Sequence, residues 1–221
     1  MLRVDRLRKS FEGRKIFDLT FTLGPGEFCV LLGENGVGKT TLFRCLLRLE
    51  NYDGSVHVEG TQRRDAFFGV LDQPMMYAAW TASQNIRYLL NDSNAHLLPP
   101  AARLLEPSWS RAKVGRLSTG QRKMVLLAAA LASRATIVLF DEFANGLDQG
   151  ARALFRESVR EQLRKGERSF IATGHDLRAF GDLPSRVLAM RDGSLTDVTE
   201  AYLARRDMEE VYEAYVARTD P

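Results

Sequence analysis

At positions 33 to 40 the chain reads Gly33-Glu34-Asn35-Gly36-Val37-Gly38-Lys39-Thr40. This stretch fits the pattern G-x-x-x-x-G-K-S/T, in which glycines let the backbone wrap closely around phosphate groups. The residues before it, Phe28 to Leu32, are apolar and β-prone, and Thr41 to Leu47 has the composition of a helix. The N–H groups at the start of such a helix attract anions. We therefore predict a phosphate-binding loop between a buried strand and a helix.

Two side chains of this loop have specific expected roles. Lys39 carries a full positive charge that can reach the β- and γ-phosphates of a nucleotide, and Thr40 offers a hydroxyl to Mg²⁺. A chance glycine turn before a helix is the alternative, and the strand and helix on either side disfavour it. The residues expected to surround the phosphates are Gly33, Glu34, Asn35, Gly36, Val37, Gly38, Lys39, Thr40 and Thr41.

The composition is that of an ordinary globular protein. Of 221 residues, 45% are hydrophobic and 27% are charged. No apolar run approaches the roughly 20 residues that cross a bilayer, and Met1 to Arg6 lacks an apolar signal core. The two cysteines, Cys29 and Cys45, make no disulfide scaffold, which favours a reducing, cytosolic setting. Basic residues exceed acidic ones only slightly, 31 against 28, and are scattered, so no nucleic-acid partner is expected.

The spacing of apolar residues predicts an α/β fold with an antiparallel β layer at the N-terminus. Two strands, Leu2 to Leu7 and Phe17 to Leu23, form that layer, and the turn Pro25-Gly26 leads into the strand before the phosphate-binding loop. The other expected strands are Ser55 to Glu59, Ala66 to Leu71, Ala135 to Phe140, Arg168 to Thr173, and a hairpin of Val187 to Met190 with Ser194 to Asp197.

Three further helices are expected. Met124 to Ala132 is strongly apolar, Ala151 to Lys165 is amphipathic and is followed by Gly166, and Thr199 to Ala217 is a charged terminal helix. An amphipathic pattern of this kind indicates one face packed on a core and one in water.

The segment from Ser83 to Trp109 differs from the rest of the chain. It contains two short helical pieces, Gln84 to Leu90 and Ala101 to Leu105, separated by polar and proline residues. We expect a small helical subdomain, about residues 74–134, inserted into one α/β domain that covers residues 1–221.

Two acids follow a buried strand, since Asp141 and Glu142 come directly after Ile137 to Phe140. A nucleotide-hydrolysing site needs a carboxylate at a strand end to hold Mg²⁺, which prefers oxygen ligands and keeps much of its water. Asp141 suits that role, and Glu142 is placed to orient and polarise an attacking water. The alternative is a pair of acids that merely caps a junction between strand and loop.

A second helix start has the features of an anion site. Leu117-Ser118-Thr119-Gly120-Gln121 precedes the apolar helix and offers N–H groups at the positive end of the helix dipole. The simplest use of a second site of this kind is to close over a nucleotide held by another subunit. An ordinary N-cap at Ser118 is the alternative.

Two more polar residues stand at predicted strand ends. His175 follows the strand Arg168 to Thr173, at the edge where open α/β sheets bind ligands, which favours a contact with a γ-phosphate. Gln73 follows the strand Ala66 to Leu71 and is placed similarly, although a polar residue in a turn explains it equally well.

In their order and spacing these motifs resemble the ATP-binding subunit of an ABC transporter, and the resemblance covers nearly the whole chain. Gly33 to Thr40 is similar to the Walker A motif, Gln73 to the Q-loop, and Leu117 to Gln121 to the signature motif. The fold that this implies is α/β, with a P-loop NTPase core of the ABC type, an N-terminal antiparallel β layer and a small helical subdomain.

The remaining motifs fit the same family. Asp141 and Glu142 are similar to the end of Walker B and the catalytic glutamate, Asn145-Gly146-Leu147-Asp148 to the D-loop, and His175 to the switch histidine. Phe11 falls where the family has an aromatic residue that stacks on adenine, and a buried core phenylalanine is the alternative.

The resemblance implies an ATPase in which two subunits pack head to tail and trap two ATP molecules. Its Mg²⁺ would be held by Thr40, Gln73 and, through water, Asp141, and its catalytic residues would be Lys39, Gln73, Glu142 and His175. Besides the phosphate-binding loop, the ATP contacts would be Phe11, Ser118, Thr119, Gly120, Gln121 and Asp148.

It also implies partners: a second ABC ATPase subunit, identical or different, and a transmembrane permease that holds the chain on the cytoplasmic face of the cell membrane. Met75 to Trp80 fits an apolar docking surface for the permease, and ordinary core is the alternative. The form of Asn145 to Asp148 and the absence of a C-terminal regulatory domain favour export.

Departures from the family pattern and two other interpretations remain. Thr119 stands where glycine is more frequent and Phe143-Ala144 replaces the usual Pro-Thr, so activity with an atypical rate is expected.

One alternative is a soluble ABC ATPase that works in DNA repair, on the ribosome or in metal-cluster assembly. The other is a P-loop kinase or a non-hydrolysing nucleotide-binding module, which the signature segment and His175 disfavour.

Overall fold

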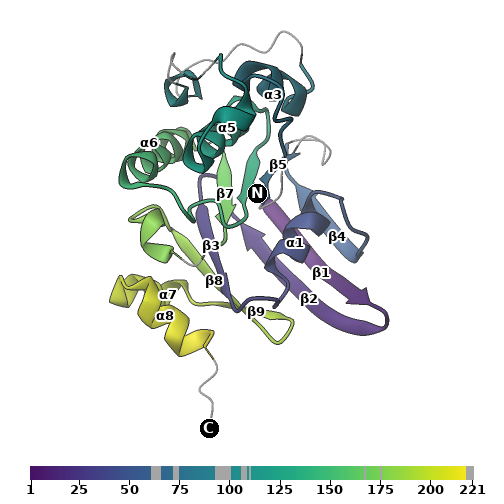
Figure 1. Ribbon diagram of the computed structural model, residues 1–221. Coiled ribbons are helices and arrows are strands. Elements are labelled where there is room, and N and C mark those ends of the chain that lie inside the picture. Colours follow the sequence, from purple (N-terminus) through teal and green to yellow (C-terminus); the bar gives the residue numbers. More distant parts are fainter. Residues whose placement is uncertain are drawn as a thin grey trace.

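The computed structural model describes residues 1–60, 66–71, 75–92, 101–105, 109, 111–166, 168–174 and 176–217. These residues form two sheets with helices packed around them (Figure 1). The strands are β1 (Leu2–Phe11), β2 (Arg14–Leu23), β3 (Phe28–Gly33), β4 (Asp53–Val58), β5 (Phe67–Val70), β6 (Ile137–Phe140), β7 (Ser169–Ala172), β8 (Arg186–Arg191) and β9 (Ser194–Asp197).

The helices are interspersed among these strands, and two of them, α7 and α8, follow the last strand. The α-helices are α1 (Lys39–Leu46), α3 (Ala82–Leu89), α5 (Thr119–Ala132), α6 (Gln149–Lys165), α7 (Thr199–Arg205) and α8 (Met208–Tyr215), and the short 3-10 turns are η1 (Ala101–Leu104), η2 (Val114–Arg116) and η3 (Leu177–Phe180). No helix in the described ranges is long and apolar enough to span a membrane.

The antiparallel N-terminal layer is confirmed. It is a three-stranded sheet in the order β2-β1-β4, in which Leu2 lies opposite both Leu23 and Val58. The β1–β2 hairpin is longer than expected, because β1 continues to Phe11 and β2 begins at Arg14. Buried and exposed residues alternate along much of both strands, as on a sheet with one packed face.

The central sheet has six strands in the order β5-β6-β7-β3-β8-β9. Its pairs are parallel except for β9, which returns antiparallel to β8 through the predicted hairpin. Every residue of β3, β6 and β7 is buried, because both faces of the sheet are covered. These three strands hold the loops that follow them in fixed positions.

Strand β3 lies between two hydrophobic cores. Phe28, Val30 and Leu32 join the core that contains α5 and α6. Cys29 and Leu31 point the other way, into the core shared by the N-terminal sheet and α1. The alternation has a period of two, as in any strand, so one apolar run serves both cores and anchors the loop at its end.

The C-terminal helix differs from the prediction, because Thr199 to Ala217 forms two helices rather than one. Arg206 has a left-handed backbone with a φ of 55°, which ends α7. Asp207 then caps α8 by accepting hydrogen bonds from the N–H groups of Glu209 and Glu210. The break turns Val211 into the core, where it is fully buried.

The described part of the expected helical subdomain lies in the upper part of Figure 1, where α3 and η1 pack against α5. Helix α5 begins at Thr119 rather than Met124, because Ser118 caps it. Ala101–Leu104 is a single 3-10 turn rather than an α-helix. The proline-containing segment before it lies outside the described residues, and the limits of the subdomain stay a prediction.

Candidate functional site

The phosphate-binding loop connects β3 to α1, as predicted. Gly36 and Gly38 have left-handed backbones, with φ of 78° and 116°, which residues with a side chain rarely adopt. A Cβ on Gly38 would also lie only 3.1 Å from Cγ2 of Ile16 in β2. The first N–H groups of α1 have no acceptor inside the helix, so they are available to an anion in the loop.

Lys39 is folded back over this loop. Its ammonium donates to the carbonyl oxygens of Gly33, at 2.6 Å, and Glu34, at 2.9 Å, and the residue is 8% exposed. Burial lowers the pKa of Lys39 from its ordinary value, and the carboxylates of Glu142 and Asp141 act against that shift. The ammonium of Lys39 thus lies beside two acids and a glycine loop, in a position to bind a polyphosphate.

Asp141 joins the end of β6 to the start of α1. Its Oδ2 accepts a hydrogen bond of 2.7 Å from the hydroxyl of Thr40, and its Oδ1 accepts one of 2.8 Å from the hydroxyl of Thr173. The side chain is buried, with 3% of the residue exposed. Both carboxylate oxygens are therefore held in place, and two oxygen ligands suited to a hard divalent cation lie side by side.

Glu142 is half-buried and has an unusual backbone. Its φ is 50°, in the left-handed region that favours glycine. Its N–H donates to the hydroxyl oxygen of Thr173 at 3.1 Å, and its Oε2 accepts from Nδ2 of Asn145 at 3.1 Å. Left-handed backbone at a residue with a long side chain is concentrated at functional sites.

The signature segment and the D-loop residue both cap helices. The hydroxyl of Ser118 accepts from the N–H of Gln121 at 3.1 Å, and the side chain of Gln121 accepts from the N–H of Ser118 at 2.9 Å. Asp148 accepts from the N–H of Ala151 at 2.8 Å. The ordinary N-cap considered for Ser118 is thus present, and these three bonds do not reach Lys39. Thr119 is exposed at the start of α5.

Phe11 is not in the core. It stands at the end of β1 with 45% of its surface exposed, and the ammonium of Lys9 lies 4.5 Å from its ring centroid. This excludes the alternative of a buried core phenylalanine. Stacking on an adenine stays a prediction.

The other predicted site residues fall into three groups. Asn35, Gly36, Thr40 and Asp148 are exposed, Gly33 and Gly38 are buried, and Glu34, Val37, Thr41, Gly120 and Gln121 are half-buried. The structure brings Lys39, Thr40, Asp141 and Glu142 together. Gln73 and His175 lie outside the described residues, so their places in the site stay predictions.

Two residues that the sequence analysis missed contact this site. Thr173 bonds to both acids, and Lys123 of α5 donates to the carbonyl oxygens of Glu142, Phe143 and Asn145. A polar residue at the end of a buried strand is a usable signal for Thr173. Lys123 gives no such signal, because a lysine near a helix start usually lies in water.

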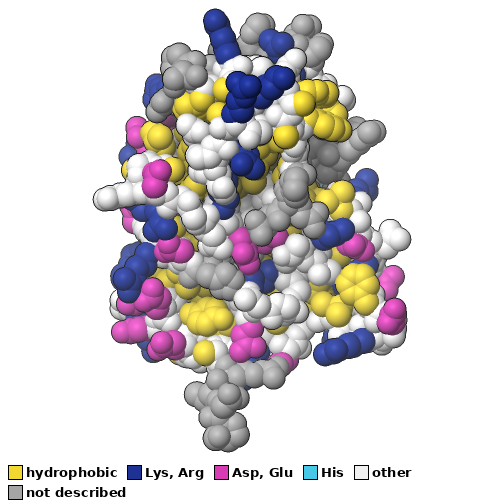
Figure 2. Space-filling model, viewed as in Figure 1, with side chains coloured by type: hydrophobic (Ala, Val, Ile, Leu, Met, Phe, Trp, Pro, Cys, Tyr) yellow, Lys and Arg dark blue, Asp and Glu magenta, His cyan; other side chains and the backbone are white. Residues whose placement is uncertain are grey.

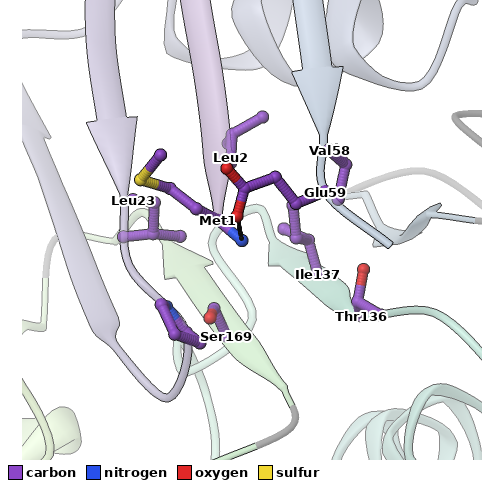
Figure 3. Close-up of a pocket in the computed structure, with 9 residues that line it drawn as sticks. Met1, Leu2, Leu23, Val58, Glu59, Thr136, Ile137 and Ser169 are labelled. Carbon is purple, nitrogen blue, oxygen red and sulfur yellow. Dashed lines mark ion pairs between the residues drawn. The ribbon is translucent and has the colours of Figure 1, made fainter. Parts of the chain in front are cut away.

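A separate cavity of about 180 Å³ lies at the other edge of the central sheet. Figure 3 shows Ile137 and Ser169, which begin β6 and β7, together with Leu2 and Leu23, and an ion pair of 3.6 Å between the N-terminal amine and Glu59. We call this side of the sheet the amino edge, and the side with the phosphate-binding loop and the acids the carboxyl edge. Open α/β sheets bind ligands at the carboxyl edge.

Comparison with known proteins assigns the family. The family model described as "ABC transporter" matches residues 16–145, which include the phosphate-binding loop and both acids. The SkfA peptide export ATP-binding protein SkfE of Bacillus subtilis (strain 168) is 29% identical, over 88% of this chain and 87% of its own length. The Fe(3+) ions import ATP-binding protein FbpC 2 of Pectobacterium atrosepticum is 30% identical, over 89% of this chain and 62% of its own length.

A solved structure supports the fold. The structure described as an ATP-binding subunit of an ABC transporter superposes with a TM-score of 0.84 at 20% identity, over 97% of this chain and 99% of the other. The chain belongs to the ABC transporter family. Within that family it is an ATP-binding subunit, and its enzymatic class is ATPase.

Proposed function

We propose that this chain hydrolyses ATP with Mg²⁺ at the carboxyl edge and that it drives export through a separate membrane permease. The observation that carries the proposal is the hydrogen bond of 2.7 Å between the hydroxyl of Thr40 and Oδ2 of Asp141. It ties the phosphate-binding loop to the acid at the end of β6, so one site contains both the phosphate cradle and a carboxylate.

The paired oxygens of Thr40 and Asp141 fit Mg²⁺, which in nucleotide sites is commonly held by one or two protein oxygens plus phosphate oxygens. Gln73 is proposed as a further ligand. Mg²⁺, when bound, neutralises charge on the transferring phosphoryl group. Asp141 is held by two hydroxyl donors, so its carboxylate needs little rearrangement to accept the metal.

The remaining chemistry is positioning and charge stabilisation. Lys39 exchanges its two carbonyl partners for phosphate oxygens when ATP enters. Glu142 orients the attacking water, and His175 is proposed to contact the γ-phosphate. Phe11, exposed on β1, is proposed to stack on the adenine.

A second subunit completes the proposed site. Ser118 is exposed at the start of α5, where backbone N–H groups and the positive end of the helix dipole point outward. In the proposed head-to-tail dimer, Ser118, Thr119, Gly120 and Gln121 of one subunit close over the ATP bound by Lys39 of the other. Asp148 is proposed to contact that nucleotide as well.

An exposed aromatic patch is proposed to dock the permease. Tyr77, Trp80 and Tyr88 are 49%, 38% and 53% exposed, and their ring centroids lie 4.5 to 5.7 Å apart. A groove of about 530 Å³ runs beside Trp80 and Tyr88. Figure 2 shows hydrophobic side chains at the surface in its upper part, where Figure 1 places α3 and α5. Within Met75 to Trp80, Met75 and Met76 are half-buried and pack against the core, so the alternative of ordinary core applies to these two residues.

The first experiment uses the purified chain and its Glu142→Gln variant. We expect Mg²⁺-dependent ATPase activity in the unsubstituted chain, and in the variant retained ATP binding with turnover nearly abolished. Substantial turnover by Glu142→Gln would contradict the proposed role of this residue.

The second experiment identifies the partner. Tagged Glu142→Gln protein is recovered from the native cell in mild detergent with ATP, beside a Trp80→Ala, Tyr88→Ala version of the same protein. A multi-span membrane protein at near-equal amount, lost from the version without the two rings, supports the permease and the docking patch. Recovery of only soluble proteins would favour a soluble ABC ATPase.

The direction of transport needs its own test, because the relatives include both a peptide exporter component and an iron importer component. The form of Asn145 to Asp148 supports export. With the recovered permease in proteoliposomes, cargo should move away from the side that receives ATP. Movement toward that side would show import. In the cell, the chain is proposed to lie on the cytoplasmic face of the membrane, held there by the permease.

A further inference from the structure

Glu142 holds a backbone conformation that its own side chain disfavours. Its φ of 50° lies in the left-handed region, where Cβ crowds the neighbouring backbone, so an isolated peptide would leave this region. Such a conformation persists only where the surroundings over-determine it. The groups that bind the N–H and the C=O of Glu142 therefore hold its peptide in this conformation, while Nδ2 of Asn145 contacts its carboxylate directly.

Thr173 binds the N–H side. In the pairing of β6 with β7, Phe140 lies opposite Ala172, so Asp141 and Thr173 follow side by side at the strand ends. The Thr173 hydroxyl has one proton, which it donates to Oδ1 of Asp141 at 2.8 Å. Its oxygen then accepts the N–H of Glu142 at 3.1 Å. Thr173 is fully buried, so water does not compete for either bond.

Lys123 binds the C=O side. Its ammonium donates to the carbonyl oxygens of Glu142, Phe143 and Asn145 at 3.2, 2.8 and 2.6 Å. An ammonium has three protons to donate, and these three carbonyl oxygens lie within reach of them. It also lies 5.8 Å from the ring centroid of Phe143, which is wedged between Phe140 and Phe155. Phe143 is a departure from the family pattern, and its buried ring anchors the turn that follows Glu142 in the aromatic core. Lys123 binds the carbonyl oxygens of the same turn from α5.

We propose that Lys123 and Thr173 are positioning residues that hold the peptide of Glu142 in its left-handed conformation and so aim its carboxylate at the attacking water. The proposal rests on the proposed ATPase role of Glu142. It adds two residues, one in α5 and one directly after β7, that act through Glu142 and do not touch the nucleotide. Replacing Lys123 removes bonds to carbonyl oxygens alone, whereas replacing Thr173 removes its bond to Oδ1 of Asp141 together with its bond to the N–H of Glu142.

The chain offers matched controls for both residues. Arg168 donates to the carbonyl oxygens of Ala130, Leu131 and Ser133, so it clamps the other end of α5, about 15 Å along the helix axis. Ser169 is buried at the other end of β7 and donates to the carbonyl of Gly24 at 2.8 Å. Arg168→Met and Ser169→Ala therefore remove the same kinds of bond far from the acids.

The test compares Lys123→Met and Thr173→Val with these two controls. Steady-state kinetics give kcat and KM for ATP, titration calorimetry gives the Kd for ATP, and thermal unfolding gives the folded fraction. We expect kcat to fall about 10- to 100-fold in both variants, with Kd nearly unchanged, because the carboxylate is misplaced while the phosphate-binding loop is intact. Thr173→Ser keeps the hydroxyl and should restore kcat, and the controls should keep kcat per folded molecule.

A double-substitution cycle separates positioning from general destabilisation. If Lys123 acts through Glu142, then Lys123→Met should lower the residual kcat of Glu142→Gln no further. An additional loss of the full size in that background, or a wild-type kcat in Lys123→Met and Thr173→Val, would overturn the proposal. Either result would leave the assignment of Glu142 itself intact, provided that Glu142→Gln is inactive.

A readout without turnover covers the case in which the ATPase assignment fails. Hydrogen exchange at the amide of Glu142 in the nucleotide-free protein should be faster in Thr173→Val than in the parent and in Ser169→Ala. Unchanged exchange would show that Thr173 does not hold this peptide. Absence of ATPase activity in the parent, with exchange changed as expected, would reject the proposed function and keep only the structural part of the inference.

Discussion

The two edges of the central sheet are built from the same strands and differ in what they hold. At the carboxyl edge, a lysine ammonium and two carboxylates lie close enough to influence one another, and Gly36, Gly38 and Glu142 have left-handed backbones. At the amino edge, Ser169 and the ion pair of Glu59 with the N-terminal amine border a small cavity. The buried lysine and the two acids thus lie where the parallel strands end.

The difference shows that the same aromatic core packs under both edges, but that only part of it lies next to the acids. Phe28 at the start of β3 and Phe140 at the end of β6 stack on either side of Phe170, with centroid distances of 6.0 Å in both cases. One aromatic column therefore runs beneath the three neighbouring strands β3, β7 and β6. Only its carboxyl end, through Phe140 and Phe143, lies directly under the acids.

The largest expected effects come from cutting this column. Phe140→Ala and Phe28→Ala should each lower the free energy of unfolding by about 3–5 kcal/mol, because each leaves a cavity in a close-packed core. Denaturant titration measures both losses. In the fraction that stays folded, Phe140→Ala should also lower kcat, whereas Phe28→Ala should not. Equal kcat in the two variants would remove the distinction between the edges.

Lys39→Met should have the next largest effect. Loss of a preorganised charge at the phosphates costs about 10²–10³ in rate, and kcat/KM for ATP should fall by about that factor. The control is Lys165→Met, at the end of α6 and near the amino edge, where the ammonium pairs with Glu161 at 3.8 Å on the surface. If Lys165→Met lowered kcat/KM as much as Lys39→Met, the functional contrast between the carboxyl edge and the amino edge would be wrong.

Helix ends give intermediate effects. Ser118→Ala removes the cap of α5 and should cost about 0.5–2 kcal/mol of stability. Gly166→Ala forces a side chain into the left-handed end of α6, with φ of 68°, and should cost about 1–2 kcal/mol. Only Ser118→Ala should weaken ATP-driven dimerisation, measured by sedimentation in the Glu142→Gln background. Equal weakening by Gly166→Ala would argue against the proposed dimer contact.

The smallest effect is expected for Glu59→Gln. The side chain of Glu59 is 58% exposed and its ion pair spans 3.6 Å. Exposed pairs of this kind contribute little, so the free energy of unfolding should change by less than about 0.5 kcal/mol. Calorimetric unfolding and an ATPase assay should both match the parent chain. A clear loss of activity would show that the amino edge is coupled to the site.

Much of the fold follows from local patterns. Largely apolar runs predicted β3, β6 and β7, and the turn at Arg191 to Gly193 predicted the β8–β9 hairpin. Helix ends were harder, since α5 begins at Thr119 through a capping box and α7 ends at Arg206 without a glycine or proline. The cap of α5 was visible at Ser118, but no local signal marks the break at Arg206.

The sequence by itself determined the order of strands and helices, the phosphate-binding loop and the two acids after β6, because these depend on residues close together in the chain. Only the tertiary structure decided that Phe11 is exposed, that Glu142 is left-handed, and that Thr173 and Lys123 hold its peptide. Those features depend on bonds between residues 19 to 31 positions apart and on which surfaces the cores cover. A local pattern carries no information about such contacts until the strands and helices have packed.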